Sequence, residues 1–286
     1  MLDPRKLRLL RDLSRRGTIA AVADALTFTP SAVSQQLSAL EREAGVALLE
    51  RTGRTVALTP AGVLLVEHAH TVLEQLERAS AALAAISGGP AGPLRIGTFP
   101  TAARVLLPVA LAELPPALEP MVFEIDPADV SAALRAGELD VALVHEYDFV
   151  PPVTDASVDT EPLFTETMYL TSRSAIADAR DDPWITNKPG TLCHAMAIRA
   201  CQAAGFEPRV RHHIDDFDTI LAFAAAGHGV ALVPRLAALS PPPDVRLAPL
   251  PLARRTLAAF RKGYGGHPAI TAAVAAFHAA ISRLAL

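Results

Sequence analysis

The spacing of apolar residues near the amino terminus predicts two short helices joined by a tight turn. The first helix follows a capping Thr18, and its apolar residues recur at helical spacing as far as Leu26. The second helix follows a capping Thr29 and begins with Pro30, where a missing N–H has no cost. Its apolar residues are spaced by four, three and four and therefore share one face: Val33, Leu37, Leu40 and Ala44.

The opposite face of the second predicted helix carries small polar side chains: Ser31, Ser34, Gln35 and Ser38. Gln can bond bidentately to adenine, and Ser can bond to several base edges or to a phosphate. A polar face backed by an apolar one is what a helix in the major groove of DNA requires. The alternative is an ordinary two-helix hairpin whose polar face is solvated.

A short β-ribbon is predicted next, with residues 48–49 entering and residues 56–58 leaving. Arg51 and Arg54 flank Gly53 at its tip. Two arginines beside a polar helix are typical of a wing that touches phosphates or the minor groove. The alternative is a solvated turn whose arginines touch nothing.

Thr59 and Pro60 repeat the capping signal and open a longer helix. Its apolar residues are spaced 4, 3, 4, 3, 4 and 3, which is an unbroken heptad seam: Leu65, Ala69, Val72, Leu76, Ala79, Leu83 and Ile86. This seam predicts a two-chain coiled coil. A helix packed on its own domain is the rival interpretation, but a broader apolar stripe would then be expected. Residues 87–93, rich in Gly and Pro, read as a hinge.

The remainder alternates between strands and helices. Strands at 94–97, 121–125 and 139–144 with helices at 101–114 and 127–136 predict a parallel βαβαβ unit. A second block has strands near 168–171, 210–214, 230–233 and 256–260, and helices near 192–204, 219–226 and 268–284. Two α/β lobes joined by two crossings describe a periplasmic-binding-protein-like clamp, which binds its ligand at the carboxyl ends of the strands.

The predicted fold class is therefore α/β, with an N-terminal winged helix-turn-helix, a long dimerisation helix and a two-lobed periplasmic-binding-protein-like domain that binds a ligand between its lobes. The expected boundaries are residues 1–58, 59–92 and 93–286. Lobe I of the clamp should comprise about 93–160 and 262–286, and lobe II about 161–261.

Charge is distributed unevenly along the 286 residues. The net charge is −4, yet residues 1–60 carry +3 and the rest −7. A basic amino-terminal segment on an otherwise acidic chain favours binding of a polyanion by that segment alone. Because its net charge is small, we expect several copies of the segment to bind together. The chain shows no apolar run long enough for a membrane span, no signal-peptide core and two cysteines, so we expect a cytoplasmic protein without membrane partners.

The first sixty residues closely resemble the signature of LysR-type transcriptional regulators, and the organisation of the remainder fits as well. The matching residues are Gly17, Thr18, residues 21–23, Leu26, residues 31–37, Leu40, Glu41, Gly45, Leu48, Leu49, Arg51 and residues 58–62. The resemblance implies DNA contacts from the start of the recognition helix and from the wing. Together with the helix pattern, it gives these candidates: Thr29, Pro30, Ser31, Ala32, Ser34, Gln35, Ser38, Arg51 and Arg54. Many members have Arg where this chain has Gln35, which suggests a preference for adenine over guanine.

The resemblance also implies the partners. They are double-stranded DNA, read as an interrupted palindrome by a homodimer or by a homotetramer of coiled-coil dimers, and a small-molecule effector whose binding alters how the DNA is bent. The resemblance also suggests RNA polymerase as a further partner, and we expect no cofactor.

Candidate effector contacts follow strand ends. Hydroxyls at the turn after the first strand favour an anion such as a carboxylate, and the family's contacts include this turn. An acidic run at 215–218 could hold a cation or could simply cap a helix. Together they would suit a zwitterion such as an amino acid. The candidates are Thr98, Phe99, Pro100, Thr101, His145, Tyr147, Phe164, Asp216 and Asp218.

The sequence carries weaker signals of other functional classes. Cys193 and Cys201 loosely resemble the paired cysteines of the family's peroxide-sensing branch. Eight residues on a continuous helix span ~12 Å, however, which is too far for a disulfide without local unfolding. The scattered histidines, including His212 and His213, lack metal-ligand spacing. An enzyme would show a nucleophile elbow or a phosphate-binding loop, and a transport receptor would carry a secretion signal. A structural nucleoid protein would be more basic. The sequence shows none of these features.

Overall fold

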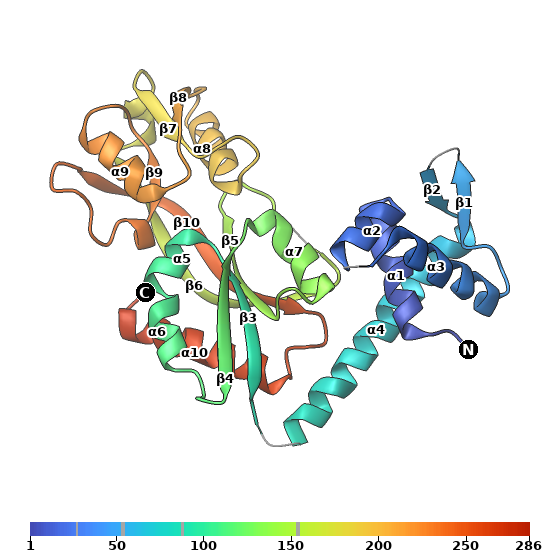
Figure 1. The fold of residues 1–286 in the computed structure, drawn as a ribbon. Helices are drawn as coiled ribbons and strands as arrows, with labels where there is room; N and C mark the ends of the chain where they lie inside the picture. The colour runs from blue at the N-terminus through green and yellow to red at the C-terminus, as the bar shows by residue number, and fades with distance from the viewer. Residues whose placement is uncertain (27, 53–54, 87–88, 153–154) are drawn as a thin grey trace. The chain divides into compact units, whose positions relative to one another are not determined.

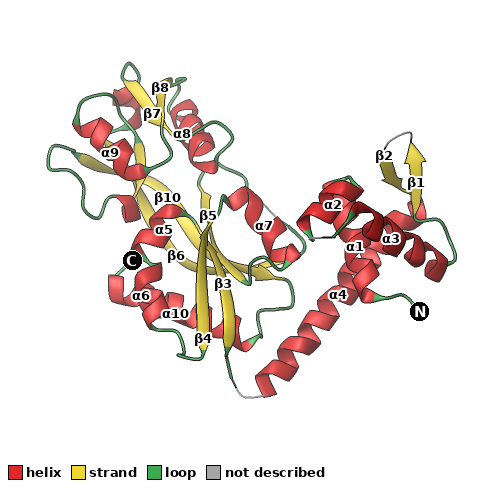
Figure 2. Cartoon of the chain, viewed as in Figure 1, coloured by secondary structure: helices red, strands yellow, loops and turns green. Residues whose placement is uncertain are grey.

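The computed structural model describes residues 1–26, 28–52, 55–86, 89–152 and 155–286. Contacts between Cα atoms divide the chain into two units, Met1–Gly89 with Lys262–Pro268, and Pro90–Arg261 with Ala269–Leu286. Figure 1 shows the course of the chain, and Figure 2 shows its helices and strands. In the described part of the chain, none of the helices has the length and apolar character needed to span a membrane.

The first unit contains the predicted hairpin of helices and one helix that precedes it. Its elements are α1 (Pro4–Arg16), α2 (Ile19–Ala25), α3 (Pro30–Ala44), β1 (Leu49–Thr52), β2 (Thr55–Leu58) and α4 (Pro60–Ile86). The Thr18 hydroxyl accepts from the Ala21 N–H at 3.1 Å, and the Thr29 hydroxyl accepts from the Ala32 N–H at 3.2 Å. Both predicted caps are therefore confirmed.

Apolar residues of α1 to α4, together with Leu48 just before β1, form the core of this unit: Leu7, Leu9, Leu10, Leu13, Val22, Ala23, Val33, Leu37, Leu40, Leu48, Val66 and Ala69. One close approach requires glycine. A Cβ at Gly62 would lie 2.2 Å from the carbonyl oxygen of Leu48, so the first turn of α4 can pack on the ribbon only without a side chain there.

The heptad seam on α4 divides into two parts. Ala69 is completely buried in the core of its own unit, and Leu65 packs partly against that core. The prediction that Ala69 faces a partner chain is corrected, because α4 uses its first turns to cover α1; for half-buried Leu65 it stays a prediction. Farther along, the exposed residues of the seam are Val72, Leu76, Ala79 and Leu83, while the side chain of Ile86 lies outside the described residues.

The second unit is built on a six-stranded sheet of order β4-β3-β5-β10-β6-β9. Its strands are β3 (Gly92–Thr98), β4 (Leu118–Glu124), β5 (Val141–Tyr147), β6 (Val158–Thr171), β9 (Leu232–Pro234) and β10 (Leu247–Arg261). Strand β3 is parallel to both β4 and β5, which confirms the βαβαβ unit. The two longest strands, β6 and β10, pair antiparallel along most of their length and run through both lobes.

The helices of lobe I are α5 (Pro100–Val105), α6 (Leu107–Ala112), α7 (Pro127–Ala136) and α10 (Pro268–Leu284). A single helix over residues 101–114 was predicted, whereas the chain breaks it at Leu106. The break has a physical cause, because Pro108 lacks the N–H that would bond four residues back. Helix α7 packs on β5 and β10 through Val130, Ala133 and Leu134.

Lobe II contains β7 (Pro183–Thr186), β8 (Arg209–His213), α8 (Leu192–Ala203), α9 (Phe217–Ala225) and two short 3-10 turns, Ile176–Ala179 and Arg235–Ala237. Strands β7 and β8 are parallel. The sequence pattern missed β7, because four residues beginning with Pro183 carry almost no alternation. Fully buried Trp184 anchors this strand and donates its indole N–H to the Ala179 carbonyl at 3.0 Å.

Candidate DNA-binding surface and effector cleft

Helix α3 has one buried face and one exposed face. Val33, Leu37 and Leu40 are at most 1% exposed, while Gln35 and Ser38 on the other side are exposed. The remaining candidates at the start of the helix divide similarly: Thr29, Pro30 and Ser31 are exposed, and Ala32 and Ser34 are half-buried. The polar face is thus available to a ligand rather than sealed against the chain.

The ribbon after α3 is held by a residue of α3 itself. One carboxylate oxygen of Glu41 accepts from the backbone N–H groups of Leu48 and Leu49, at 2.9 and 3.0 Å. The carboxylate therefore fixes where β1 begins relative to the polar face. Arg54 lies outside the described residues, and so does the side chain of Arg51, although its backbone belongs to β1.

The second unit has a cavity of about 500 Å³ between its lobes. Four helices begin at this cavity, and their N-cap residues, two from each lobe, all line it: Phe99, Asp126, Thr191 and Asp216. This is the position expected for a ligand site in an open α/β sheet, outside the carboxyl ends of the strands. We call this cavity the cleft.

Six of the nine predicted effector contacts line the cleft: Phe99, Pro100, Thr101, His145, Asp216 and Asp218. Thr98 is fully buried and donates its hydroxyl to the Phe99 carbonyl at 3.3 Å, so its side chain serves the turn itself. Tyr147 lines a neighbouring cavity instead, and Phe164 lines neither. The cleft therefore brings together six of the nine candidates and does not include Thr98, Tyr147 and Phe164 among its lining residues.

The acidic run both caps a helix and lines the cleft. Asp216 accepts from the N–H and the hydroxyl of Thr219, at 2.8 and 2.6 Å, so it is the N-cap of α9. Asp218 pairs with Arg104 of lobe I, and Asp215 pairs with Lys188 at 2.7 Å. The capping interpretation of Asp216 is therefore confirmed.

A buried ion pair that the sequence pattern missed lies at the base of the cleft. Arg254 and Glu166 are each 1% exposed and their side chains meet at 2.7 Å. Arg254 also donates to the Thr101 hydroxyl at 3.0 Å and lies over the ring of Phe99, 4.9 Å from its centroid. Neither charge stands out in the sequence, because Arg254 is followed directly by Arg255 and Glu166 lies between Thr165 and Thr167.

His145 stands beside this pair and lacks a bond that it could make. Its ring is 4.7 Å from that of Phe99 in an edge-on arrangement, and its Nδ1 is buried without a hydrogen-bond partner, as is the hydroxyl of the adjacent Thr256. Burial, together with the charge of Arg254, lowers the pKa of His145 well below its usual value. The imidazole is therefore neutral at pH 7.

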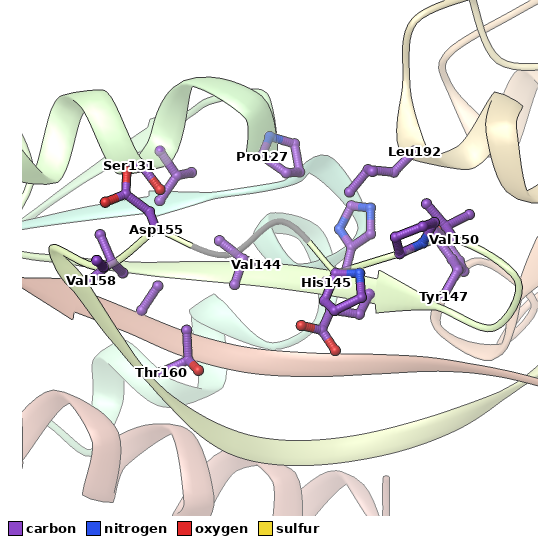
Figure 3. A pocket seen from close by; sticks show the side chains of 16 residues that line it. Pro127, Ser131, Val144, His145, Tyr147, Val150, Asp155, Val158, Thr160 and Leu192 are labelled. Carbon is purple, nitrogen blue, oxygen red and sulfur yellow. The ribbon is translucent and has the colours of Figure 1, made fainter. Parts of the chain in front are cut away.

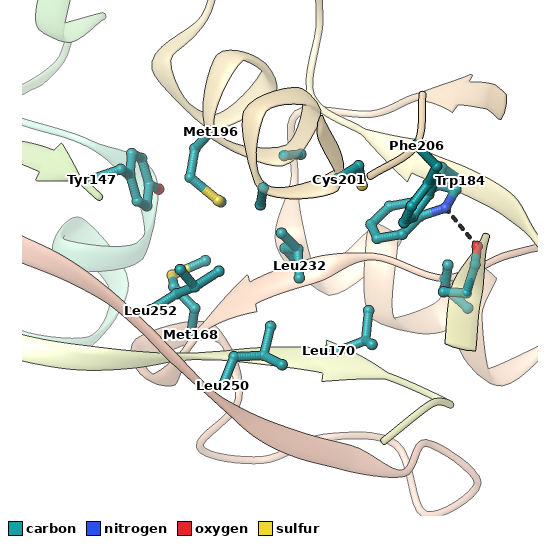
Figure 4. Packing of buried hydrophobic residues seen from close by; sticks show 14 residues of the cluster. Tyr147, Met168, Leu170, Trp184, Met196, Cys201, Phe206, Leu232, Leu250 and Leu252 are labelled. Carbon is teal, nitrogen blue, oxygen red and sulfur yellow. Dashed lines mark hydrogen bonds between the residues drawn. The ribbon is translucent and has the colours of Figure 1, made fainter. Parts of the chain in front are cut away.

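The two cysteines lie in different environments, and neither favours a thiolate. Cys193 lines the cleft, with its Sγ 3.2 Å from the Tyr147 hydroxyl and 4.0 Å from Nε2 of His145. Cys201 is fully buried in the apolar cluster around Trp184 (Figure 4). Burial raises the pKa of Cys193, and burial with nearby Glu207 raises that of Cys201 to about 12.

A second cavity of about 360 Å³ lies beneath helix α7 (Figure 3). It shares Pro127, His145 and Leu192 with the cleft. Most of the rest of its wall is apolar, including Val130, Val144, Val150 and Val158. We call it the α7 cavity. Elsewhere, the histidines form no metal centre: in the described chain, no three His, Cys, Asp or Glu side chains are grouped to bind a metal ion.

A helix-turn-helix with an exposed polar helix, followed by a two-lobed α/β unit with a cleft, defines a DNA-binding regulator with an effector domain. Residues 4–63 match the family model "Bacterial regulatory helix-turn-helix protein, lysR family", and residues 87–282 match "LysR substrate binding domain". The chain therefore belongs to the LysR family of transcriptional regulators.

Individual relatives agree with this assignment. The chain is 34% identical over 266 residues to the HTH-type transcriptional regulator TfdS of Cupriavidus pinatubonensis, covering 86% of each chain. It is 31% identical over 249 residues to the hydrogen peroxide-inducible genes activator of Dickeya chrysanthemi, covering 82% of this chain and 80% of that one.

Solved structures of full-length regulators share the fold. An OxyR variant from Pseudomonas aeruginosa superimposes with a TM-score of 0.66 at 23% identity, covering 97% of this chain and 95% of that one. CbnR in complex with its target DNA gives 0.53 at 24% identity, covering 99% of both chains.

Proposed function

We propose that this chain binds its operator with the exposed face of α3 and with the wing, and that a small molecule in the cleft changes that binding. The observation that carries the proposal is the exposure of Ser31, Gln35 and Ser38 opposite a fully buried apolar face. The protein acts in the cytoplasm by regulation rather than catalysis, and RNA polymerase is the protein partner on which a promoter-bound regulator would act.

The active form is a homodimer or a homotetramer. Exposed apolar residues of α4 at 72, 76 and 83 support the dimer, since isolated helices seldom leave a heptad seam in water. A dimer places two copies of α3 on a two-fold symmetric site. The effector belongs to the amino acids or the carboxylic acids, because both acidic and hydroxyl groups line the cleft.

Replacing Gln35 by Ala tests the base-reading role. We expect the preference for the operator over single-base variants to fall by about 1–3 kcal/mol, the usual value of one bidentate base contact. Non-specific binding should be unchanged, because phosphate contacts do not depend on this side chain. Gel shifts with operator variants and with unrelated DNA at fixed salt give both quantities.

Arg54→Ala is the matched comparison. It should weaken binding to all sequences alike and reduce the slope of affinity against salt by about 1. A footprint unchanged by either substitution would show that this surface has been assigned wrongly.

A thiol-based redox switch at Cys193 and Cys201 is the alternative, supported by the peroxide-responsive relative and by the position of Cys193 in the cleft. The raised pKa values oppose it, since the thiolate is the reactive form. We expect both thiols to remain countable after brief peroxide treatment at pH 7, and their alkylation to accelerate only above pH 9. Loss of both thiols with formation of a disulfide would favour the switch instead.

A further inference from the structure

The cleft is lined by more carboxylates than cations. The carboxylates are Glu124, Asp126, Asp215, Asp216 and Asp218, and the cations are Arg104 and Arg254. Both arginines are committed, Arg104 to Asp218 and Arg254 to buried Glu166. A plain carboxylate ligand would therefore enter a wall of its own sign, which disfavours its binding.

Two of these carboxylates face the cleft from opposite lobes with an oxygen to spare. Asp126 uses Oδ1 to cap α7, accepting from the Ala128 N–H at 2.9 Å. Asp216 uses Oδ2 to cap α9. In the described chain, neither is paired with a basic side chain. The second oxygen of each is thus placed to accept from a cationic group of a ligand.

The start of α8 offers the complementary contact. Thr191 accepts from the His194 N–H at 3.2 Å, and its carbonyl accepts from the Ala195 N–H at 3.1 Å. The N–H groups of Leu192 and Cys193, the first two residues of this twelve-residue helix, have no acceptor within the helix. Both residues line the cleft, so a carboxylate there would receive two backbone hydrogen bonds.

His145 borders both cavities. It is 6% exposed, and its ring forms part of the wall of both the cleft and the α7 cavity. Figure 3 shows it close to Pro127 and Leu192, the other two residues common to both cavities. Beyond these three residues the α7 cavity is mainly apolar. A ligand that extends from the cleft past His145 would therefore place an apolar group there.

We propose that the effector is an α-amino acid with an apolar side chain. Its ammonium group lies between Asp126 and Asp216, its carboxylate meets the first N–H groups of α8, and its side chain passes His145 into the α7 cavity. This inference rests on the proposed function and narrows the ligand to one class. Because the two aspartates belong to opposite lobes, the ammonium group also favours closure of the cleft.

Matched probes test the three parts of the ligand. Titration calorimetry on the full chain would compare L-phenylalanine with 3-phenylpropanoate, which lacks the amine, and 2-phenylethylamine, which lacks the carboxylate. Leucine, 4-methylpentanoate and 3-methylbutylamine form a second set. In at least one set the amino acid should bind at least tenfold more tightly than the acid. Equal or tighter binding of the acids, or no binding by any amine-bearing probe, would overturn the proposal.

Conservative variants locate the ammonium site. Asn caps helices as well as Asp does, so Asp126→Asn and Asp216→Asn remove charge while keeping both helix starts. Each should weaken amino-acid binding at least tenfold, whereas Glu207→Gln, an exposed carboxylate that lines neither cavity, should not. Ser131→Phe, which fills the α7 cavity, should weaken phenylalanine but not alanine. Unchanged affinities in the two aspartate variants would contradict the assignment.

Operator binding separates this inference from the function on which it rests. If the ligand-free chain binds its operator specifically and responds to carboxylates alone, the regulator proposal stands and the amino-acid inference fails. If the chain shows no sequence-specific DNA binding, the regulator proposal fails whatever the cleft binds.

Discussion

Substituting Arg254 with Met is expected to lower the free energy of unfolding of the effector unit by about 3–5 kcal/mol, because it leaves the Glu166 carboxylate buried without its cation. This would be a large share of the stability of a typical domain, about 5–15 kcal/mol. Trp184, the single tryptophan of the chain, is fully buried in the same unit, so its fluorescence during urea unfolding reports the loss.

Two further variants show whether the ion pair is the cause. Adding Glu166→Gln to Arg254→Met should recover most of the loss, since Gln keeps an acceptor for the Leu236 N–H, now 2.7 Å from Glu166, without a buried charge. Arg173→Met breaks an exposed pair with Asp182 and should cost only about 0–1 kcal/mol. An Arg254 variant as mild as the Arg173 variant would show that the buried pair contributes little.

Placing Asp at both Leu76 and Leu83 is expected to abolish dimerisation and to weaken operator binding about 10²–10⁴-fold. Both leucines are exposed on α4, and two carboxylates per chain in a shared apolar seam would repel one another. Affinity should fall because, in a dimer, binding of one DNA-binding unit holds the second at high effective concentration near its half-site, and a monomer lacks this effect. Light scattering after gel filtration and gel shifts measure the two effects.

Thr71→Asp is the control, since it adds a charge to the same helix at an exposed position outside the seam. It should leave both oligomeric state and operator affinity unchanged. A double Leu76 and Leu83 variant that remained dimeric would place the subunit contact elsewhere.

Features that depend on neighbouring residues could be predicted from the sequence. Thr18 and Thr29 cap their helices through residues three positions away, so the signal and its partner lie in one short segment. The parallel unit of β3, β4 and β5 could also be predicted, because the apolar residues of each strand and helix in it follow the spacing typical of that element. Pro108 indicated the break at Leu106, but the apolar residues around it favoured the prediction of one continuous helix.

Features that depend on distant residues could not be predicted. Arg254 and Glu166 are 88 positions apart and meet because β10 and β6 pair in that register. The heptad spacing of Ala69 indicated an apolar neighbour but not whether it belonged to this chain or to a partner. Likewise, nothing local distinguished Thr98, which supports its own turn, from Thr101, which lines the cleft.

The continuity of β6 and β10 through both lobes has a mechanical consequence. Their register shifts between Pro249 and Ala253, next to the row that carries Arg254, so the ladder is already irregular where the lobes meet. Bringing the lobes together must bend these strands rather than swing a loose connector, and bent strands tend to straighten. Ligand binding should therefore supply the free energy that closes the cleft. When the ligand is released, the strands should straighten and the cleft should reopen.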